Sequence, residues 1–404
     1  MNAANLGNMI AKLRKKNGMT QNELAKKLSV TDKAVSKWES GMGYPEITQL
    51  PALSDIFGVT VDYLLKGNTK GIVIAGNMLV DIVNIISKYP QKNMLVDIYD
   101  VSKAVGGCVC NTIIDLAKIN PDLFLAASGR IGDDDNGQYL LSEFRKYGID
   151  TTNVLVSKDV PTSFTSVMSE KETGERTFFH ARGANSKFSI EDIDIDNLEC
   201  EIFHIGYALL LDKMDSFDPE YGTVMAKTLA KVQSKGIKTS LDMVSSEVDN
   251  FAETVLPNFK YCDYVIINEI EACKVAGLEP RDDSGKLNVA NLKAAMEKIM
   301  ECGVKEKVVV HCVEAGFMLN ADGKFTIVPS LELPKGYIKG SVGAGDAFAA
   351  GCLYGLYSGF SDEYILEFAS GAAAMNLTEA DSISGMKSQK EIEKLLKTYN
   401  RKEM

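Results

Sequence analysis

Residues 340–351 read GSVGAGDAFAAG, and this stretch decides what the second half of the chain can be. It holds four glycines, four alanines and one carboxylate, Asp346, so few side chains surround the acidic group. A glycine-rich turn that runs into a helix lets backbone N–H groups approach an anion, and the positive end of the helix dipole favours the same charge. We therefore expect a helix that begins near Gly345 and presents its free amide groups to an anion.

Asp346 falls in the first turn of this predicted helix. A carboxylate there can face a hydroxyl group bound beside the anion. This suits phosphoryl transfer, in which amide groups of Gly343, Ala344 and Gly345 stabilise the transferred group. Other phosphate motifs fit poorly, because the chain has no GxxxxGK[ST] segment and GAGDAF is not GxGxxG. A helix cap packed for structural reasons alone remains the alternative for this segment.

Around this segment, from residue 72 onward, apolar strands alternate with amphipathic helices. The predicted strands cover residues 72–83, 123–132, 199–211, 238–244, 263–269 and 307–312. The predicted helices between them include residues 111–119, 221–236 and 291–303. This alternation predicts an α/β fold with a mostly parallel sheet and helices on both faces.

Two segments break the alternation: SFTSVMSE (163–170) and RTFFHAR (176–182), separated by KETGE. Their polar–apolar rhythm predicts a β-hairpin. A hairpin added to an α/β sheet is either an edge decoration or a lid over a site. We expect a small β lid, because loops at strand ends carry function in such sheets.

The first 66 residues differ from the rest, since they read as short helices without a strand. Residues 1–45 hold 8 Lys/Arg against 3 Asp/Glu, although the whole chain has a net charge of −11. Such asymmetry suggests a module that faces nucleic acid. We predict three parts and two lid segments: an all-α helix-turn-helix domain (1–67), a linker (68–71), and an α/β domain (72–404) with lid segments at about 84–104 and 162–182.

Within the first part, Thr20 and Glu23 form a capping box that opens a helix at QNELAKKL. Thr31 caps the next helix, DKAVSKWES, which Gly41 ends. Two short helices across a tight turn are the helix-turn-helix arrangement. Three residues fall at spacings that pack inside: Ala25, Val35 and Trp38.

The segments TQNELAKKLSV, AVSKWESG and YPEITQLPALSDIFGVTVDYLLKG resemble the lambda-repressor-like (Xre-type) family over about residues 5–67. The resemblance implies that DKAVSKWES enters the major groove of double-stranded DNA. Ser29 stands where this family often has glycine. The candidate DNA-contacting residues are Gln21, Thr31, Lys33, Ala34, Ser36 and Lys37. One such module covers little DNA, so we expect a homodimer on a two-half-site operator; a bundle that binds protein is the alternative.

About residues 71–385 resemble the ribokinase-like (phosphofructokinase B-type) carbohydrate kinase family. The matching elements, in family order, are GNMLVD (76–81), VGGCVCNTIIDLA (105–117), RIGDDDNG (130–137), RGAN (182–185), NEIE (268–271) and GSVGAGDAFAAG. The resemblance implies an ATP-dependent kinase with Mg²⁺, Asp346 as general base, and an anion hole at Gly343, Ala344 and Gly345. It also implies that the hairpin closes over the sugar. The implied substrate contacts are Asp81, Gly106, Gly107 and Asn111, and the implied nucleotide and magnesium contacts are Asn268, Glu271 and Gly316.

Three departures from that family limit what the resemblance implies. Gly340-Ser341 replaces an Asp-Thr pair whose aspartate helps bind a monovalent cation, so dependence on such a cation stays open. Residues 311–313, His-Cys-Val, replace Thr-x-Gly of the nucleotide loop, so contacts to adenine must differ. Leu79 and Cys108 replace polar residues that hold ribose in ribokinase. The expected acceptor is therefore another sugar, a deoxy sugar or a nucleoside.

Composition excludes other classes. No run of about 18 apolar residues occurs, so we expect no membrane span and a cytoplasmic protein. Eight cysteines without CxxC spacing and three separated histidines predict reduced thiols and no structural metal. The competing functional hypothesis is a transcription regulator whose kinase-like domain only senses a sugar or nucleoside ligand. A third possibility links the two, with substrate binding shifting operator affinity.

Overall fold

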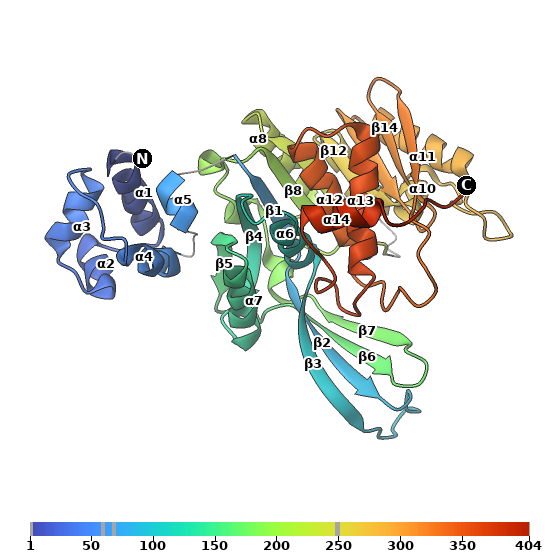
Figure 1. Ribbon diagram of the computed structural model, residues 1–404, viewed down its shortest axis with the longest axis horizontal. Helices are drawn as coiled ribbons and strands as arrows, with labels where there is room; N and C mark the ends of the chain where they lie inside the picture. Colours follow the sequence, from blue (N-terminus) through green and yellow to red (C-terminus); the bar gives the residue numbers. More distant parts are fainter. Residues whose placement is uncertain (1–2, 58–60, 67–69, 247–250, 404) are drawn as a thin grey trace.

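The computed structural model describes residues 3–57, 61–66, 70–246 and 251–403 of the 404-residue chain. A helical unit lies at one end, and an α/β unit forms the rest (Figure 1). The helices of the first unit are α1 (Ala3–Lys16), α2 (Gln21–Leu28), α3 (Asp32–Glu39), α4 (Gln49–Phe57) and α5 (Val61–Lys66).

Local hydrogen bonds define the two helices of the helix-turn-helix. Thr20 and Glu23 form the predicted capping box of α2, and the Thr31 hydroxyl accepts the Ala34 N–H at 3.2 Å at the start of α3. Ser29, between them, adopts the left-handed backbone conformation with φ of 55°. The predicted inward-facing residues are confirmed as buried: Ala25, Val35 and Trp38.

The α/β unit is built on a nine-stranded sheet in the order β15-β14-β13-β12-β11-β8-β1-β4-β5. Strands β5 to β13 of this order run parallel, and only β14 and β15 are antiparallel additions. The strands are β1 (Ile72–Gly76), β4 (Leu125–Gly132), β5 (Asp150–Ser157), β8 (Ile202–Ala208), β11 (Lys238–Met243), β12 (Tyr264–Asn268), β13 (Lys307–His311), β14 (Ala315–Asn320) and β15 (Phe325–Pro329). The predicted mostly parallel sheet is confirmed.

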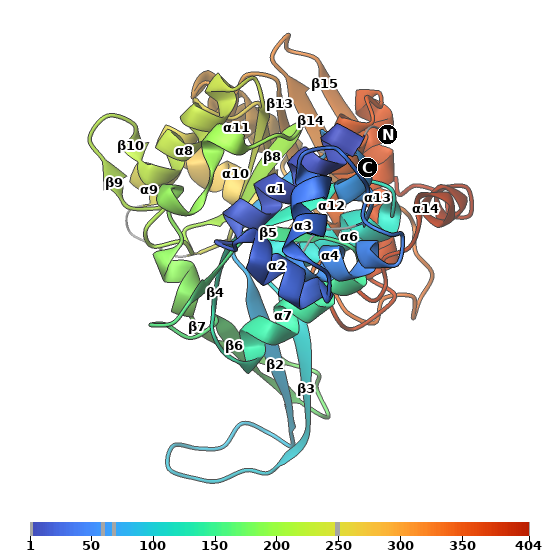
Figure 2. The same cartoon turned by 90° about the vertical axis from the view of Figure 1, so that its left-hand side faces the viewer.

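Helices cover both faces of this sheet (Figures 1 and 2). Two large apolar clusters, one on each face, form the core. The helices are α6 (Cys108–Ile119), α7 (Asp135–Lys146), α8 (Val224–Ser234), α9 (Phe251–Phe259), α10 (Glu269–Ala276), α11 (Val289–Glu301), α12 (Ala344–Tyr357), α13 (Asp362–Asn376) and α14 (Gln389–Leu396). A short hairpin, β9 (Phe217–Asp218) and β10 (Gly222–Thr223), precedes α8.

The single strand predicted over residues 72–83 is wrong. The chain leaves the main sheet after Gly76, whose φ is 123° and whose added Cβ would lie 2.4 Å from the Gly206 carbonyl oxygen. A new strand, β2 (Leu79–Ile86), then begins in a second sheet. Asp81 therefore lies on β2 and not at the end of the first strand.

The second sheet has four strands in the order β3-β2-β6-β7 and projects from the edge of the α/β unit (Figure 1). Its other strands are β3 (Ile98–Gly106), β6 (Phe164–Glu170) and β7 (Arg176–Ala181). The predicted hairpin is confirmed, because β6 and β7 pair antiparallel. The two predicted lid segments contain β6, β7, most of β3 and the end of β2.

Phe124, just before β4, connects the two units. Its side chain packs against the core of the helical unit and against one core of the α/β unit. A pocket of about 350 Å³ beside it is lined by Lys12 and Lys15 of α1 and by the segment before β8. Of the predicted linker, residues 68 and 69 lie outside the described residues.

Three predictions from composition can be compared with the described residues. No described helix is long and apolar enough to cross a membrane. All eight cysteines are free thiols. In the part of the chain that the structure describes, no group of three or more His, Cys, Asp or Glu residues could hold a metal ion.

Candidate active site

The glycine-rich stretch forms the start of α12, next to the C-terminal edge of the main sheet. The helix begins at Ala344, one residue before the predicted Gly345, and Gly343 adopts φ of 77° at its N-cap. A side chain at Gly343 would collide with Ser382, since an added Cβ would lie 2.6 Å from the Ser382 Cβ. Asp346 sits in the first turn and is 5% exposed.

Two side chains far away in the sequence hold the Asp346 carboxylate. Asn111 of α6 donates from Nδ2 to Oδ2 at 2.8 Å, and the Asn111 Oδ1 in turn accepts from the Ser382 hydroxyl at 2.8 Å. The Tyr207 hydroxyl lies 3.2 Å from Oδ1 and 3.1 Å from Oδ2. The structure thus brings together Asn111 and Asp346, both predicted, with a tyrosine that the sequence did not single out.

Burial sets the charge of this site. It raises the pKa of Asp346 to about 6, although the hydrogen bonds from Asn111 and Tyr207 lower it. The pKa of Asp81 also rises to about 6, first through burial and then through the charge of Asp346, while a hydrogen bond with Thr165 opposes the rise. The charge of Asp346 therefore acts on Asp81, and the pKa of each carboxyl lies at about 6.

The paired glycines before α6 let the chain pass close to these groups. An added Cβ on Gly106 would lie 2.5 Å from the Asp81 Oδ2. Gly107 has φ of 83°, and an added Cβ would lie 2.5 Å from Oδ1 of Asn77. The Asn77 amide is buried and has no hydrogen-bond partner among the described residues. Gly106 and Gly107 thus lie beside polar side chains at this edge, and their contact with a substrate stays a prediction.

The NEIE segment joins β12 to α10. Asn268 and Glu271 form a capping box, in which the Asn268 N–H donates to Glu271 at 3.0 Å and the Glu271 N–H donates back at 2.9 Å. Ser245 also donates to Glu271, at 2.8 Å. Burial raises the pKa of Glu271 to about 7. Burial raises the pKa of Asp242, at the end of β11, and the charges of Glu271 and Asp346 raise it further.

These carboxyl groups suit a magnesium ion carried by a nucleotide. Mg²⁺ is usually held by one or two carboxylates together with phosphates and waters, and not by a cage of protein ligands alone. Glu271 is buried and Asp242 is half-buried. The charge of Glu271 disfavours the charge of Asp242, a repulsion that a nearby divalent cation relieves. The donor set therefore fits the group.

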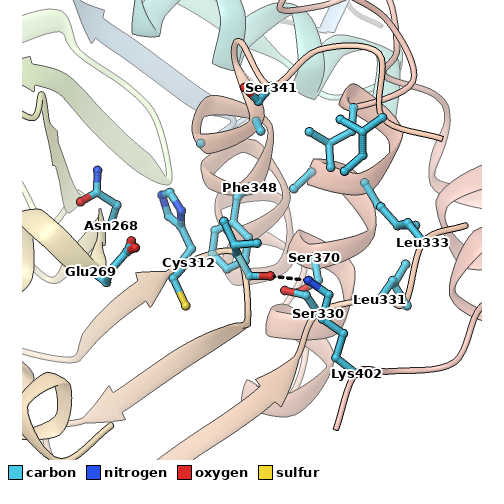
Figure 3. A pocket seen from close by; sticks show the side chains of 18 of the residues that line it. Asn268, Glu269, Cys312, Ser330, Leu331, Leu333, Ser341, Phe348, Ser370 and Lys402 are labelled. Atoms are coloured by element: carbon cyan, nitrogen blue, oxygen red, sulfur yellow. Dashed lines mark hydrogen bonds between the residues drawn. The ribbon is translucent and has the colours of Figure 1, made fainter. Parts of the chain in front are cut away.

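A pocket of about 440 Å³ links the NEIE segment to the start of α12 (Figure 3). Asn268, His311, Ala344 and Gly345 line one part of it. The rest is mainly apolar, with Val313, Leu331, Leu333, Ile338 and Phe348. Its position next to the helix N-terminus suits a flat apolar group attached to phosphates.

His311 and the chain end shape this pocket. The imidazole lies 4.9 Å from the Phe348 ring, centre to centre, and burial lowers its pKa to about 4, so it is neutral. Lys402 donates to the Val313 carbonyl oxygen at 3.0 Å and lies on the pocket wall (Figure 3). Gly316 of β14 pairs with His311 of β13, and an added Cβ would lie 3.1 Å from the Phe348 ring. Gly316, a predicted nucleotide contact, is absent from the residues that line the pocket.

The candidate DNA-contacting residues lie mostly on the surface of the helical unit. Thr31, Lys33, Ser36 and Lys37 are exposed, while Ala34 is half-buried. Gln21, expected to hold phosphates, donates to the Glu39 carboxylate at 2.8 Å. This arrangement leaves α3 with one basic outer face.

Each of the two units matches a known protein family. A helix-turn-helix model matches residues 10–64, and 47% of 58 residues are identical to the HTH-type transcriptional activator BcrR of Enterococcus faecalis, covering 14% of this chain and 28% of BcrR. The model of the pfkB family carbohydrate kinases matches residues 70–389. Fold and site thus define a carbohydrate kinase of the ribokinase-like class, preceded by a helix-turn-helix domain. The chain belongs to the pfkB family, whose members transfer phosphate to alcohol groups.

Individual relatives are distant. The 5-dehydro-2-deoxygluconokinase of Bacillus subtilis is 22% identical over 336 residues, covering 81% of this chain and 96% of that enzyme. The ribokinase of Arabidopsis thaliana is 25% identical over 331 residues, covering 81% of each chain. Among solved structures, Thermotoga maritima ribokinase has a TM-score of 0.66 at 22% identity, over 82% of this chain and all of that one. A putative ribokinase II from E. coli with ATP and Mg²⁺ has a TM-score of 0.65 at 20% identity, over 81% and 99%.

Proposed function

We propose that the protein transfers the γ-phosphate of ATP to a hydroxyl group of a sugar or nucleoside. One observation carries this proposal: a buried carboxylate, Asp346, lies in the first turn of α12, where its charge acts on Asp81 and the two preceding residues, Ala344 and Gly345, line the 440 Å³ pocket. We therefore propose that the acceptor binds on the side of Asp81 and the nucleotide in the pocket. The reacting groups then meet at the amides of Gly343, Ala344 and Gly345, of which the Ala344 N–H donates to the Ser341 carbonyl oxygen at 3.3 Å.

In this proposal Asp346 takes the proton of the acceptor hydroxyl, and Asp81 with Asn111 orients the acceptor. The N–H groups at the start of α12 stabilise the charge on the transferred phosphoryl group. Asn268 and Glu271 would hold magnesium, and the ion neutralises nucleotide phosphates when bound. The four-stranded sheet covers the acceptor and excludes water.

The acceptor wall favours substrates less polar than ribose. Leu79 and Cys108 are both buried, at 6% and 0% exposure, where ribokinase has polar ribose-binding residues. Burial also raises the pKa of the Cys108 thiol, so it offers no charge to the acceptor. We therefore propose a deoxy sugar, another modified sugar or a nucleoside.

The test measures ADP release with ATP and Mg²⁺ over sugars, deoxy sugars, sugar phosphates and nucleosides, for wild type and Asp346→Asn. We expect turnover with one acceptor class and a loss of at least about hundredfold in the variant, because general-base catalysis contributes 10²–10⁴-fold. If no acceptor is turned over but one raises the melting temperature, the protein is a ligand sensor.

We further propose that the helix-turn-helix domain binds an operator as a homodimer in the cytoplasm. The basic outer face of α3 supports this, since Lys33 in the first turn and Lys37 in the last turn are both exposed. Replacing both with alanine is expected to lower the slope of log K against log salt by about 2, because each phosphate contact contributes about one. Unchanged DNA affinity in the double variant would point to a protein partner.

Operator binding that responds to substrate is the second candidate function. Phe124 supports it, because this side chain of the α/β unit packs into the core of the DNA-binding unit. Ligand closure can shift DNA affinity only if the two states bind operator unequally. Equal operator affinity with and without acceptor and ATP would exclude the coupling.

A further inference from the structure

Tyr207, at the end of β8, combines an unusual backbone with a contact to the candidate general base. Its φ is 63°, in the left-handed region that a bulky side chain rarely adopts, and Leu209 two residues later has φ of 81°. The pairing of β8 with β11 shifts register at the same place. Strained residues of this kind persist where surrounding structure fixes them, and they gather at functional sites.

The strained backbone directs the Tyr207 ring onto the core around α6 and α12, and its hydroxyl onto Asp346. The two donors treat the carboxylate oxygens differently. Asn111 donates to Oδ2 at 2.8 Å, a full hydrogen bond, whereas the single Tyr207 proton is shared between Oδ1 at 3.2 Å and Oδ2 at 3.1 Å. Oδ1 therefore keeps the greater capacity to accept another proton.

We propose that Tyr207 is a positioning residue for phosphoryl transfer, whose hydroxyl orients the Asp346 carboxylate so that Oδ1 receives the acceptor proton. This inference rests on the proposed kinase function. In the step, the acceptor O–H bond breaks and its proton moves to Oδ1. The acceptor oxygen forms a bond to the γ-phosphorus, the bond from that phosphorus to the β–γ bridging oxygen breaks, and ADP leaves with the electron pair.

The surroundings explain why a neutral donor is needed there. Carboxyl and thiol groups from β2, α6 and β11 act electrostatically with Asp346: Asp81, Cys108, Cys110, Asp115 and Asp242. Burial and the charge of Asp346 raise the pKa of Tyr207, so its hydroxyl keeps its proton and donates. The Tyr207 and Asn111 hydrogen bonds both lower the pKa of Asp346 and so favour the ionised base.

Tyr207→Phe removes the hydroxyl and keeps the ring and the strained backbone. We expect the acid limb of kcat/KM to move to higher pH by about one unit, the lower end of what a hydrogen bond to a charged group contributes. KM for ATP should stay unchanged. Tyr354→Phe is the matched control. Tyr354 lies on α12, the helix that carries Asp346, and its hydroxyl donates to Gln389 at 2.6 Å and not to Asp346. An acid limb that stays at the wild-type pH in Tyr207→Phe overturns the proposal.

A second measurement needs no acceptor. It records the melting temperature as a function of pH for wild type, Tyr207→Phe, Asp346→Asn and the double variant. The folded-state pKa of Asp346, about 6, lies above its ordinary 3.8, so its ionisation lowers stability as pH rises through that window. Tyr207→Phe should extend this fall to higher pH, and only when Asp346 is present. Identical curves for wild type and Tyr207→Phe refute the contact, whereas absence of turnover with every acceptor refutes the kinase function instead.

Discussion

Replacing Gly343 with alanine tests whether its close approach to Ser382 builds the anion hole. Gly343 has φ of 77°, and a left-handed backbone costs an alanine about 1 kcal/mol or slightly more. The added Cβ would also lie 2.6 Å from the Ser382 Cβ and 2.8 Å from its Cα and carbonyl oxygen. Relieving such overpacking costs about 1–3 kcal/mol, so we expect a total loss of about 2–4 kcal/mol in unfolding free energy.

The same clash should reach the chemistry. The Ser382 hydroxyl donates to Asn111, and Asn111 donates to Asp346, so moving Ser382 displaces the base as well as the amide of residue 343. Losing one preorganised donor to a developing oxyanion costs about 10²–10³ in kcat. We therefore expect Gly343→Ala to lower kcat at least about hundredfold.

Gly359→Ala is the control, because Gly359 follows the other end of α12 with φ of 68° and nothing lies within 4 Å of its added Cβ. The Gly359→Ala variant should lose only about 1 kcal/mol of unfolding free energy, the cost of a left-handed backbone for alanine, and should keep the wild-type kcat. Urea unfolding and a coupled ADP assay measure both quantities. Equal losses of stability and of kcat in the two variants would refute the reasoning.

Three further results are expected. In wild type, kcat/KM should fall as the pH drops below about 6, because protonation removes Asp346 as a base; a flat profile from pH 5 to 8 contradicts this. Glu39→Gln removes the buried ion pair between Glu39 and the Arg14 guanidinium, whose atoms lie 2.6 Å apart. Unfolding followed by Trp38 fluorescence should then show a helical unit less stable by about 3 kcal/mol. An unfolding transition unchanged from wild type contradicts this prediction. Ala373→Leu narrows the 440 Å³ pocket and should raise KM for ATP about tenfold while KM for the acceptor stays constant; a rise in the acceptor KM alone would place the nucleotide elsewhere.

Local patterns in the sequence predicted the elements that local forces make. The caps of α2 and α3 depend on contacts three residues apart, from Thr20 to Glu23 and from Thr31 to Ala34. The start of α12 follows from Gly343 and Gly345, which are separated by one residue in the chain. The six predicted strands of the main fold gave its class, but the missed strands include β3, β5, β14 and β15. Of these, β3, β5 and β15 lie at sheet edges, where the apolar rhythm is weaker.

The sequence by itself determined a parallel α/β unit behind a basic helix-turn-helix, with Asp346 at a glycine-rich helix start. Only the tertiary structure decided which residues meet that carboxylate. Tyr207 lies 139 positions from Asp346 and Asn111 lies 235 positions away, yet both donate to it. The bend at Gly76 likewise moves Asp81 into the second sheet. Such contacts depend on strand order and on backbone collisions between distant segments, and no local pattern of side chains encodes either.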